Sequence, residues 1–362
     1  NPTDELSVFS VSNVQMENAD LSKLGRTHAI TLSNTGLESV KLPADGQYIT
    51  QLNLSGNKLA NFDVSKYPNL SFLTLADNKI TSIDLSPAKK LELAMISNNS
   101  LTSIVLDNPI LWNLDLSVNK LESIDLSKLP KLQQLFLASN RLTAVSVPYT
   151  QNPELTILNL VGNRLRFSTM PPANERVTKG LSKKQRYNRY SYNLQDPIKV
   201  ECVNGKVDLS SEVTAGGEPT TFRWFVGKIQ VRDGELDGEE LELNESYTLE
   251  NGVTTLKLDK AINNLVCVMT NPAFPKAVLS TDYVKFTPTG IDAVKTNEDI
   301  KIQFVAGGIN IVGGENSPVA VYSIDGKTIY RAKAATADLH ISLAPGTYIV
   351  RVGNKATKIC LK

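Results

Sequence analysis

The 362-residue sequence predicts a mainly β protein in which a repetitive solenoid of about seven coils precedes two antiparallel β-sandwich domains. Two observations support this prediction. One Leu-rich phrase recurs at an almost constant spacing between residues 27 and 165, and after residue 194 short alternating segments are separated by Asn-Gly, Gly-Gly and Asn-Pro turns. We expect the solenoid with its terminal caps to span residues 1–192, the first sandwich residues 193–287 and the second residues 288–362.

The plainest copy of the repeat, Leu132 to Leu142, reads L-x-x-L-x-L-x-x-N-x-L. The two Leu of L-x-L point into the solenoid, because side chains alternate across a strand. The Asn side chain carries both donors and an acceptor, so we expect it to satisfy backbone groups of neighbouring coils. Successive copies are 21, 21, 20, 21 and 23 residues apart and place this structural Asn at Asn57, Asn78, Asn99, Asn119, Asn140 and Asn163.

A second apolar pair follows each structural Asn, usually within an I-D-L-S phrase such as Ile83 to Ser86. This pair lines the opposite wall of the same core, and a single coil cannot bury both walls without neighbours. The phrase is too short and too β-branched for a helix, so this wall should be extended chain or turn. The pattern resembles the leucine-rich repeat family and is most similar to its short bacterial repeats. The resemblance covers close to half of the chain and implies a curved solenoid with a concave parallel sheet.

The two ends of the array depart from the pattern. The first coil carries Thr35 where the Asn belongs, and residues 1–26 are expected to cap this end. After Asn163 a Pro-Pro pair at 171–172 breaks the period, because Pro has no N–H for a ladder. Residues 173–192 are rich in Lys, Arg and Tyr. We expect a solvated loop that seals the last coil, with a polyanion or glycan contact as the alternative.

Composition excludes several classes of function. The formal net charge of +1 gives no general electrostatic argument for binding to nucleic acid or to an anionic membrane. We therefore expect no nucleic-acid partner. No run of 18 apolar residues exists, so we expect no transmembrane segment. The chain begins at Asn1 rather than Met, which suits a mature form whose targeting segment has been removed.

The three Cys, Cys202, Cys267 and Cys360, are too few and too far apart for a disulfide scaffold or a zinc site. We expect one buried disulfide or none, with Cys360 as a small buried hydrophobic residue. The two His, His28 and His340, fall in different predicted domains, which argues against a His-centred catalytic or metal site. The sequence therefore predicts no metal and no cofactor.

Trp224 and Cys267 stand where an immunoglobulin-like domain has its core Trp and its second Cys. Leu209 occupies the place of the first Cys and the tyrosine corner is missing, so the resemblance is one of architecture only. A disulfide between Cys202 and Cys267 is left open. The strands expected in this domain are residues 198–203, 206–209, 220–226, 253–258, 265–270 and 278–286.

An acidic run from Asp233 to Glu242 has Gly residues between its carboxylates. Such a run could ligate calcium, but it lacks the ordered oxygen ligands of an EF-hand loop. We expect a solvated acidic edge strand or hairpin, which protects a sheet from pairing with another chain.

The C-terminal segment is predicted to form hairpins, because Asp-Gly and Gly-Asn pairs separate its alternating strands. It contains V-Y-x-x-x-G-K at residues 321–327, L-x-x-G-x-Y-I-V-R-V at 343–352 and K-x-x-x-K at 358–362. These motifs resemble the C-terminal sorting domains of proteins that Bacteroidetes secrete by the type IX route. The resemblance implies an extracellular or bacterial cell-surface location.

Two classes of function compete. In the first, the protein is a secreted or surface-displayed binding or adhesion protein that recognises a protein or glycoprotein ligand on the concave face of the array. In the second, it is an extracellular glycan-binding or glycan-degrading protein with its site on a sandwich domain or on the repeat face. A hydrolase needs two carboxylates about 5 to 10 Å apart. Nothing in the sequence forces such a pair, so we expect binding without catalytic turnover.

The positions on either side of the second Leu of each repeat are expected to point outward on the concave sheet. The apolar and polar side chains at and beside these positions predict a binding patch, and cations that follow the structural Asn residues predict a basic rim. The predicted ligand-binding residues are Phe72, Leu93, Met95, Trp112, Asp115, Phe136, Ile157 and Asn159. The predicted basic rim consists of Lys58, Lys79, Lys120, Arg141 and Arg164.

Overall fold

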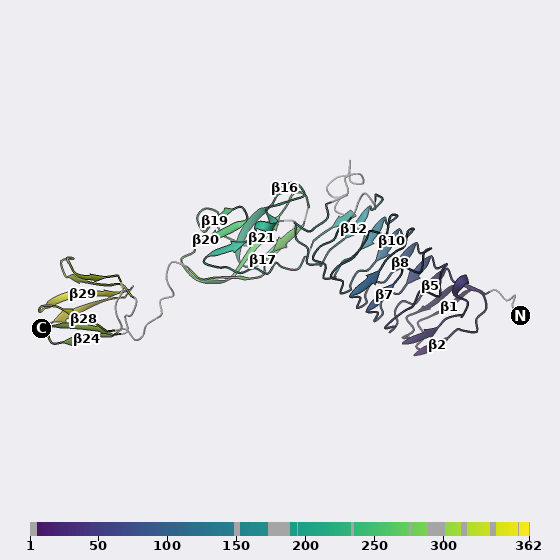
Figure 1. Ribbon diagram of the computed structural model, residues 1–362, viewed down its shortest axis with the longest axis horizontal. Coiled ribbons are helices and arrows are strands. Elements are labelled where there is room, and N and C mark those ends of the chain that lie inside the picture. Colours follow the sequence, from purple (N-terminus) through teal and green to yellow (C-terminus); the bar gives the residue numbers. More distant parts are fainter. Residues whose placement is uncertain are drawn as a thin grey trace. The chain divides into compact units, whose positions relative to one another are not determined.

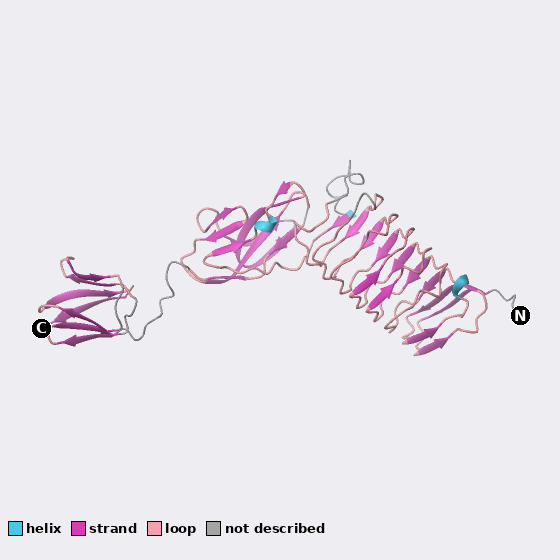
Figure 2. Cartoon of the chain, viewed as in Figure 1, coloured by secondary structure: helices cyan, strands magenta, loops and turns pink. Residues whose placement is uncertain are grey.

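A computed structural model describes residues 6–147, 153–172, 189–193, 195–232, 235–274, 277–288, 301–312, 317–333, 338–353 and 355–361. The chain divides into two compact units, Asn1–Thr287 and Pro288–Lys362 (Figure 1). Strands dominate both units (Figure 2), and short 3-10 helices occur at η1 (Gly46–Tyr48) and η2 (Ser210–Glu212). The prediction of a mainly β chain is confirmed.

The first unit contains a long parallel sheet with the strand order β1-β3-β5-β6-β8-β10-β11-β12-β13. Equivalent residues of successive coils pair directly, so that Leu114 lies between Ala94 and Leu135. The coils therefore stack into a β-solenoid of about seven turns, with a further strand at each end. The strands are β1 (Leu6–Ser12), β3 (Thr27–Ser33), β5 (Gln51–Asn53), β6 (Phe72–Thr74), β8 (Leu93–Met95), β10 (Asn113–Asp115), β11 (Gln134–Phe136), β12 (Ile157–Asn159) and β13 (Tyr190–Ser191).

The opposite wall of the solenoid is extended chain and turn, as expected. Short parallel strands form there, β2 (Asn18–Asp20) with β4 (Ser39–Lys41) and β7 (Ser82–Asp84) with β9 (Ser103–Val105). Leu85 on this wall and Leu116 from the sheet are both fully buried, so the two walls share one core. Asp84 accepts the Ser86 N–H at 2.8 Å, which closes the turn after the I-D-L phrase.

The structural Asn residues tie each coil to its neighbours. Asn119 donates its amide to the carbonyls of Ile96 in the preceding coil and Leu116 in its own, both at 3.0 Å. Its Oδ1 accepts the Leu101 N–H at 2.9 Å. The same three kinds of bond recur at Asn57, Asn78, Asn99, Asn140 and Asn163. Thr35, in the first coil, instead donates its hydroxyl to Asn57 at 2.8 Å.

The C-terminal end of the array corrects the prediction that the repeat stops near the Pro-Pro pair. Strand β13 pairs with β12, and Tyr190-x-Tyr192-x-x-Gln195 takes the place of L-x-L-x-x-N. Gln195 accepts the Leu165 N–H at 2.9 Å and donates to the Leu160 carbonyl at 2.8 Å. A longer side chain thus fills one more ladder position after a long insertion. Residues 173–188 of the basic segment lie outside the described residues.

The N-terminal cap is itself another coil. Phe9 and Val11 on β1 pair with Ile30 and Leu32 on β3, and β2 continues the opposite wall. The edge of the sheet on this side is therefore β1.

The residue before each structural Asn, and before Thr35 in the first coil, has a left-handed backbone. These positions form one column along the array, and Gly, Asn and Asp tolerate this conformation better than other residues. Val118 is an exception, because a β-branched side chain at φ 56° is strained. The column consists of Asn34, Gly56, Asp77, Asn98, Val118, Ser139 and Gly162.

Two further antiparallel sheets follow the solenoid within the first unit. Trp224 lies opposite Cys267 and donates its indole N–H to the Thr254 hydroxyl at 2.9 Å, which links the buried faces of the two sheets. One sheet contains β14 (Lys206–Asp208), β19 (Tyr247–Glu250) and β20 (Val253–Leu256). The other contains β17 (Thr221–Arg232), β18 (Glu235–Glu240), β21 (Ile262–Thr270), β22 (Val278–Ser280) and β23 (Val284–Phe286). Separately, β15 (Thr214–Ala215) pairs with β16 (Glu218–Pro219).

The strands of this region differ from the prediction. Residues 198–203 form only isolated bridges, and residues 278–286 form two strands, β22 and β23, rather than one. Strands β15, β16 and β19 were not predicted. The acidic run contributes β18, which lies at a sheet edge as expected. Arg223 donates Nε–H to Glu240 at 2.7 Å, and this hydrogen bond holds the pKa of Glu240 below its ordinary value.

The last coils of the solenoid pack against the sheets that follow. The Phe167 and Phe274 rings stack with centroids 5.6 Å apart, and Tyr192 meets Phe274 edge-on at 5.5 Å. The buried Glu212 carboxylate accepts the Ser168 hydroxyl at 2.8 Å and its N–H at 3.2 Å. Apolar burial and a satisfied buried charge both join the two parts of the first unit.

The second unit has two antiparallel sheets around its own core. Ile309, Val321 and Val350 are fully buried in that core. The three-stranded sheet contains β24 (Lys301–Val305), β25 (Gly308–Val312) and β28 (Asp338–Ser342). The four-stranded sheet contains β26 (Val319–Ser323), β27 (Thr328–Ala332), β29 (Gly346–Val352) and β30 (Lys355–Leu361).

All three Cys are free thiols. Cys267 is buried, and burial raises the pKa of its thiol. The prediction that Cys360 is buried was wrong: on β30 the neighbouring Ile359 faces the core, so strand alternation turns Cys360 outward.

We predict that Val118→Asn stabilises the protein by about 1 kcal/mol, because Asn tolerates the left-handed backbone that strains Val. Val118 is 49% exposed, so little packing is lost. Thermal unfolding followed by circular dichroism measures the change. The matched control is Val105→Asn on β9, where the exposed Val has an ordinary strand backbone and should not be improved. Equal shifts for both variants would contradict the strain argument.

We also predict that Gln195→Ala destabilises the first unit by about 3 kcal/mol, because it leaves buried backbone groups of Leu160 and Leu165 unpaired. Urea unfolding followed by tryptophan fluorescence measures the loss. Gln134→Ala is the matched control, since Gln134 makes only a 3.5 Å contact with Asn113 on the sheet surface. A loss no greater than that of the control would show that Gln195 is not part of the ladder.

Candidate functional site

The outward side of the parallel sheet is the surface that the sequence analysis singles out, and we call it the sheet face. Strand pairing places its residues in two columns. The first column reads Ala29, Gln51, Phe72, Leu93, Asn113, Gln134 and Ile157. The second reads Thr31, Asn53, Thr74, Met95, Asp115, Phe136 and Asn159. This register is the one that the repeat pattern predicts.

The structure brings the predicted apolar residues together only in part. Phe72 is paired with Leu93, and its side chain is 38% exposed. The polar strand β10 follows, with Asp115 between Met95 and Phe136 in the second column. The sheet face is therefore an apolar surface divided by a polar strand. Leu93, Met95, Phe136, Ile157 and Asn159 are half-buried.

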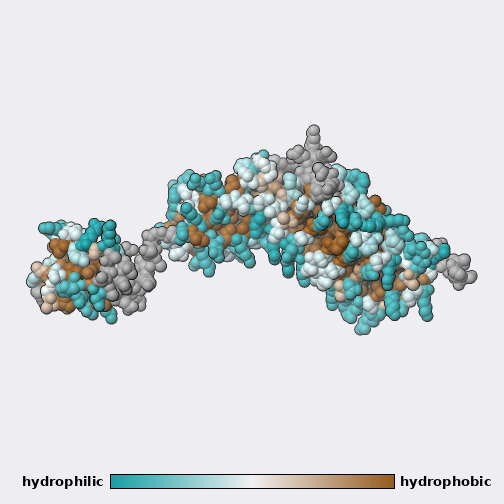
Figure 3. Space-filling view, in the orientation of Figure 1, coloured by the Kyte–Doolittle hydropathy of each residue, from teal (hydrophilic) through white to brown (hydrophobic). Residues whose placement is uncertain are grey.

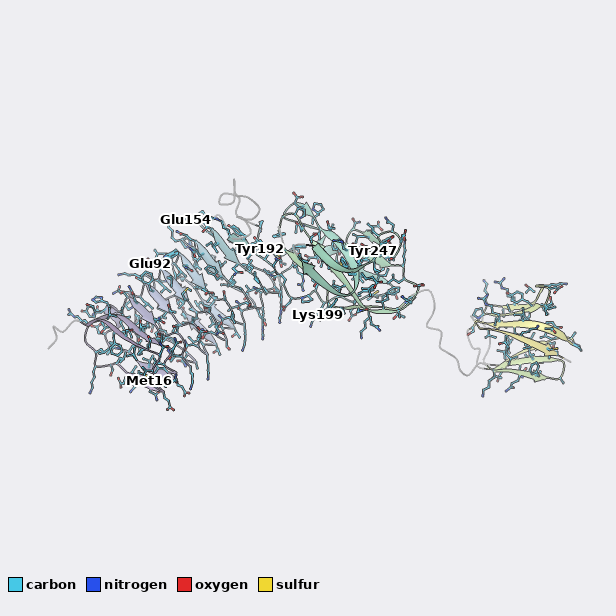
Figure 4. The ribbon with its side chains drawn as sticks, turned by 180° about the vertical axis from the view of Figure 1, so that it is seen from behind. Met16, Glu92, Glu154, Tyr192, Lys199 and Tyr247 are labelled. Carbon is cyan, nitrogen blue, oxygen red and sulfur yellow. The ribbon has the colours of Figure 1, made fainter. Side chains whose placement is uncertain are left out.

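Trp112 belongs to a third column, at the position just before the strands. The backbone N–H of Trp112 donates to the Glu92 carbonyl at 3.0 Å, and the backbone carbonyl of Trp112 accepts the Gln133 N–H at 2.8 Å. Glu92 therefore borders the sheet face, although the sequence analysis did not select it. The second position of every repeat, read as a further surface column, would have revealed it. Glu92 and Glu154 mark this side of the array in Figure 4.

Negative and positive side chains occupy different parts of this surface. In the coils that carry β5 to β12, the described residues of the three columns include the carboxylates Glu92 and Asp115 and no Lys or Arg. The basic rim runs along the array after the structural Asn residues, and all five of its side chains are exposed. In the part of the chain that the structure describes, neither Glu92 nor Asp115 makes an ion pair.

Three of the five rim cations have partners along their own edge. Lys58 lies 3.7 Å from Glu38, Arg164 lies 3.1 Å from Asp196, and Lys120 donates to the Ser100 hydroxyl at 3.2 Å. They therefore do not neutralise the carboxylates of the sheet face.

Two side chains on β10, Asp115 and Asn113, can accept further hydrogen bonds. Asp115 accepts the Ser117 N–H at 2.9 Å through Oδ1. The Asn113 Oδ1 is buried without a hydrogen-bond partner, and its amide makes only the 3.5 Å contact with Gln134. An unpartnered buried acceptor is uncommon, so the middle of the sheet face is incompletely satisfied.

The described residues contain no group of three or more His, Cys, Asp or Glu side chains that could hold a metal ion. Within the same residues, no helix is long and apolar enough to cross a membrane. In the view of Figure 3, apolar residues gather over part of the repeat array among hydrophilic ones.

Comparisons with known proteins find no matching family model and no matching curated relative. Among solved structures, the chain is similar to the functional domain of InlJ from Listeria monocytogenes, with 17% identity, 78% of this chain and 62% of that chain covered and a TM-score of 0.48. It is also similar to the leucine-rich repeat protein LIC12759 of Leptospira interrogans, with 23% identity, coverage of 38% and 44% and a TM-score of 0.32.

A third similar structure is the complex of TLR13 with ssRNA13, with 27% identity, 39% of this chain and 23% of that chain covered and a TM-score of 0.34. The chain spans less than two thirds of each of these solved chains. In this chain, the repeat spacing, the parallel sheet and the buried Asn ladder together describe a β-solenoid of about seven turns.

Proposed function

We propose that the protein is a binding or adhesion protein that recognises a protein or glycoprotein ligand on the sheet face. The observation that carries this proposal is the in-register placement of Phe72, Leu93, Met95, Phe136 and Ile157 on one surface. Apolar side chains bordered by charged ones are common on protein-binding surfaces.

The form of the surface also favours a large ligand. Seven adjoining strands, spaced about 4.8 Å apart, present an open strip roughly 30 Å long. Half-buried side chains such as Met95 and Phe136 are held by their neighbours, so they lose little side-chain entropy when a partner covers them.

We propose an extracellular or cell-surface location, with residues 288–362 as the sorting domain and with no catalytic turnover. This part of the proposal rests on the sequence motifs of the C-terminal segment. Two of them lie on described strands, V-Y-x-x-x-G-K beginning on β26 and G-x-Y-I-V-R-V on β29.

We predict that Phe72→Ala and Phe136→Ala each weaken ligand binding by more than about 1 kcal/mol, because buried aromatic anchors dominate interface energies. The ligand is first captured from the native environment with immobilised wild-type protein, and the affinity of each variant is then measured by surface plasmon resonance.

Two control variants locate the site. Val105→Ala removes an exposed apolar side chain from the opposite wall, and Phe304→Ala removes one from the second unit. Both should bind as wild type. Loss of binding in a control, with wild-type affinity in both Phe variants, would place the site elsewhere.

We further predict that deletion of residues 288–362 removes the protein from the cell surface of the source bacterium while purified material keeps its ligand affinity. Surface proteolysis and cell fractionation measure display, and the binding assay above measures affinity. The deletion removes one complete compact unit, so the first unit should keep its fold. Unchanged display would contradict the sorting role.

A further inference from the structure

We propose that the centre of the sheet face binds an arginine side chain of a protein ligand, with Asp115 as the residue that pairs with the guanidinium. This inference rests on the proposed binding function and specifies the chemistry of its partner. It starts from the nine residues at the middle of the face, which are Glu92, Leu93 and Met95, then Trp112, Asn113 and Asp115, then Gln133, Gln134 and Phe136.

The charge of this central region selects a cation. Glu92 and Asp115 are its charged residues, and in the described part of the chain neither has an ion-pair partner. Asp115 is half-buried and accepts the Ser117 N–H through Oδ1, while its Oδ2 accepts no hydrogen bond from the described residues. A carboxylate in this position attracts a positive group from a partner and disfavours an anionic one.

The neighbours of Asp115 select arginine over lysine. Met95 lies on one side and Phe136 on the other, each about 4.8 Å away in the strand-to-strand direction. A guanidinium is planar, weakly hydrated and able to stack on an aromatic ring while it donates two hydrogen bonds to one carboxylate. A lysine ammonium is strongly hydrated and would lose more on contact with Met95 and Phe136.

The same surface explains why a single arginine can set the register of a ligand. The apolar pair Phe72 and Leu93 lies on one side of β10, and Ile157 lies on the other. A ligand with arginine at its centre and apolar groups on both sides would match these three zones in order along the array. Acidic groups at its periphery would meet the basic rim.

Methionine labelling gives a direct test on the full chain. The sequence has four Met, of which Met95 lies on the sheet face, Met170 and Met269 are buried and Met16 packs against the core. The methyl signals of protein labelled with 13C-methyl methionine are followed by NMR, and Met95→Leu assigns the Met95 signal. The probes are the blocked tripeptide Ac-Leu-Arg-Leu-NH2 and its counterparts with lysine or the neutral isostere citrulline.

We expect saturable shifts of the Met95 signal with the arginine peptide, several-fold weaker binding of the lysine peptide and at least about tenfold weaker binding of the citrulline peptide. Asp115→Asn should weaken the arginine peptide by about tenfold and remove the difference from citrulline. Asp84→Asn is the matched control and should change nothing, because Asp84 lies on the opposite wall, where it accepts the Ser86 N–H as Asp115 accepts that of Ser117.

Two outcomes overturn the inference. Equal shifts with all three peptides, in wild type and in Asp115→Asn, would show an apolar site without arginine selectivity and would leave the proposed binding function intact. No shift of the Met95 signal with the arginine peptide would also reject the arginine site. The proposed function fails separately, if the captured ligand binds the Phe72→Ala and Phe136→Ala variants as it binds wild type.

Discussion

The buried Asn side chain between coils is the interaction on which the rest of the array depends. Each one satisfies a carbonyl of the coil before it, a carbonyl of its own coil and an N–H at the turn of the preceding coil, as Asn119 does for Ile96, Leu116 and Leu101. These groups lie where the chain leaves the sheet and has no strand partner. Without the amide they would be buried and unpaired, at a cost of about 1–3 kcal/mol each.

This ladder allows a core made mostly of Leu to adopt one register. Apolar packing alone is non-directional and would tolerate a shift of one coil against the next. The hydrogen bonds of Asn99 and Asn119 remove that freedom, because their donors and acceptors match only one alignment. The same alignment then places Met95, Asp115 and Phe136 side by side on the outer surface. The binding surface that we propose is thus a consequence of the ladder inside.

At the end of the array, the last coil contacts the sheets that follow it. Gln195 closes the last coil, and Tyr192 extends from that coil to contact Phe274. Glu212, buried at the same junction, accepts hydrogen bonds from Ser168 and Ser211 and has no cation at ion-pair distance among the described residues. A carboxylate held this way is sensitive to the position of its donors, so the junction favours one arrangement of the two parts within the first unit.

The sequence by itself determined the architecture of the array and the residues that point outward from it. Stacked coils repeat in space what the chain repeats in sequence, so the alternation around Leu114 and the spacing of the Asn residues translate directly into strand register. Tertiary structure decided the features that depend on distant pairing. Gln195 joins the ladder across a long insertion that erases the period, and Cys360 is exposed because Ile359, beside it on β30, faces the core of the second unit. Each of these positions depends on contacts with residues far away in the chain, which no local pattern records.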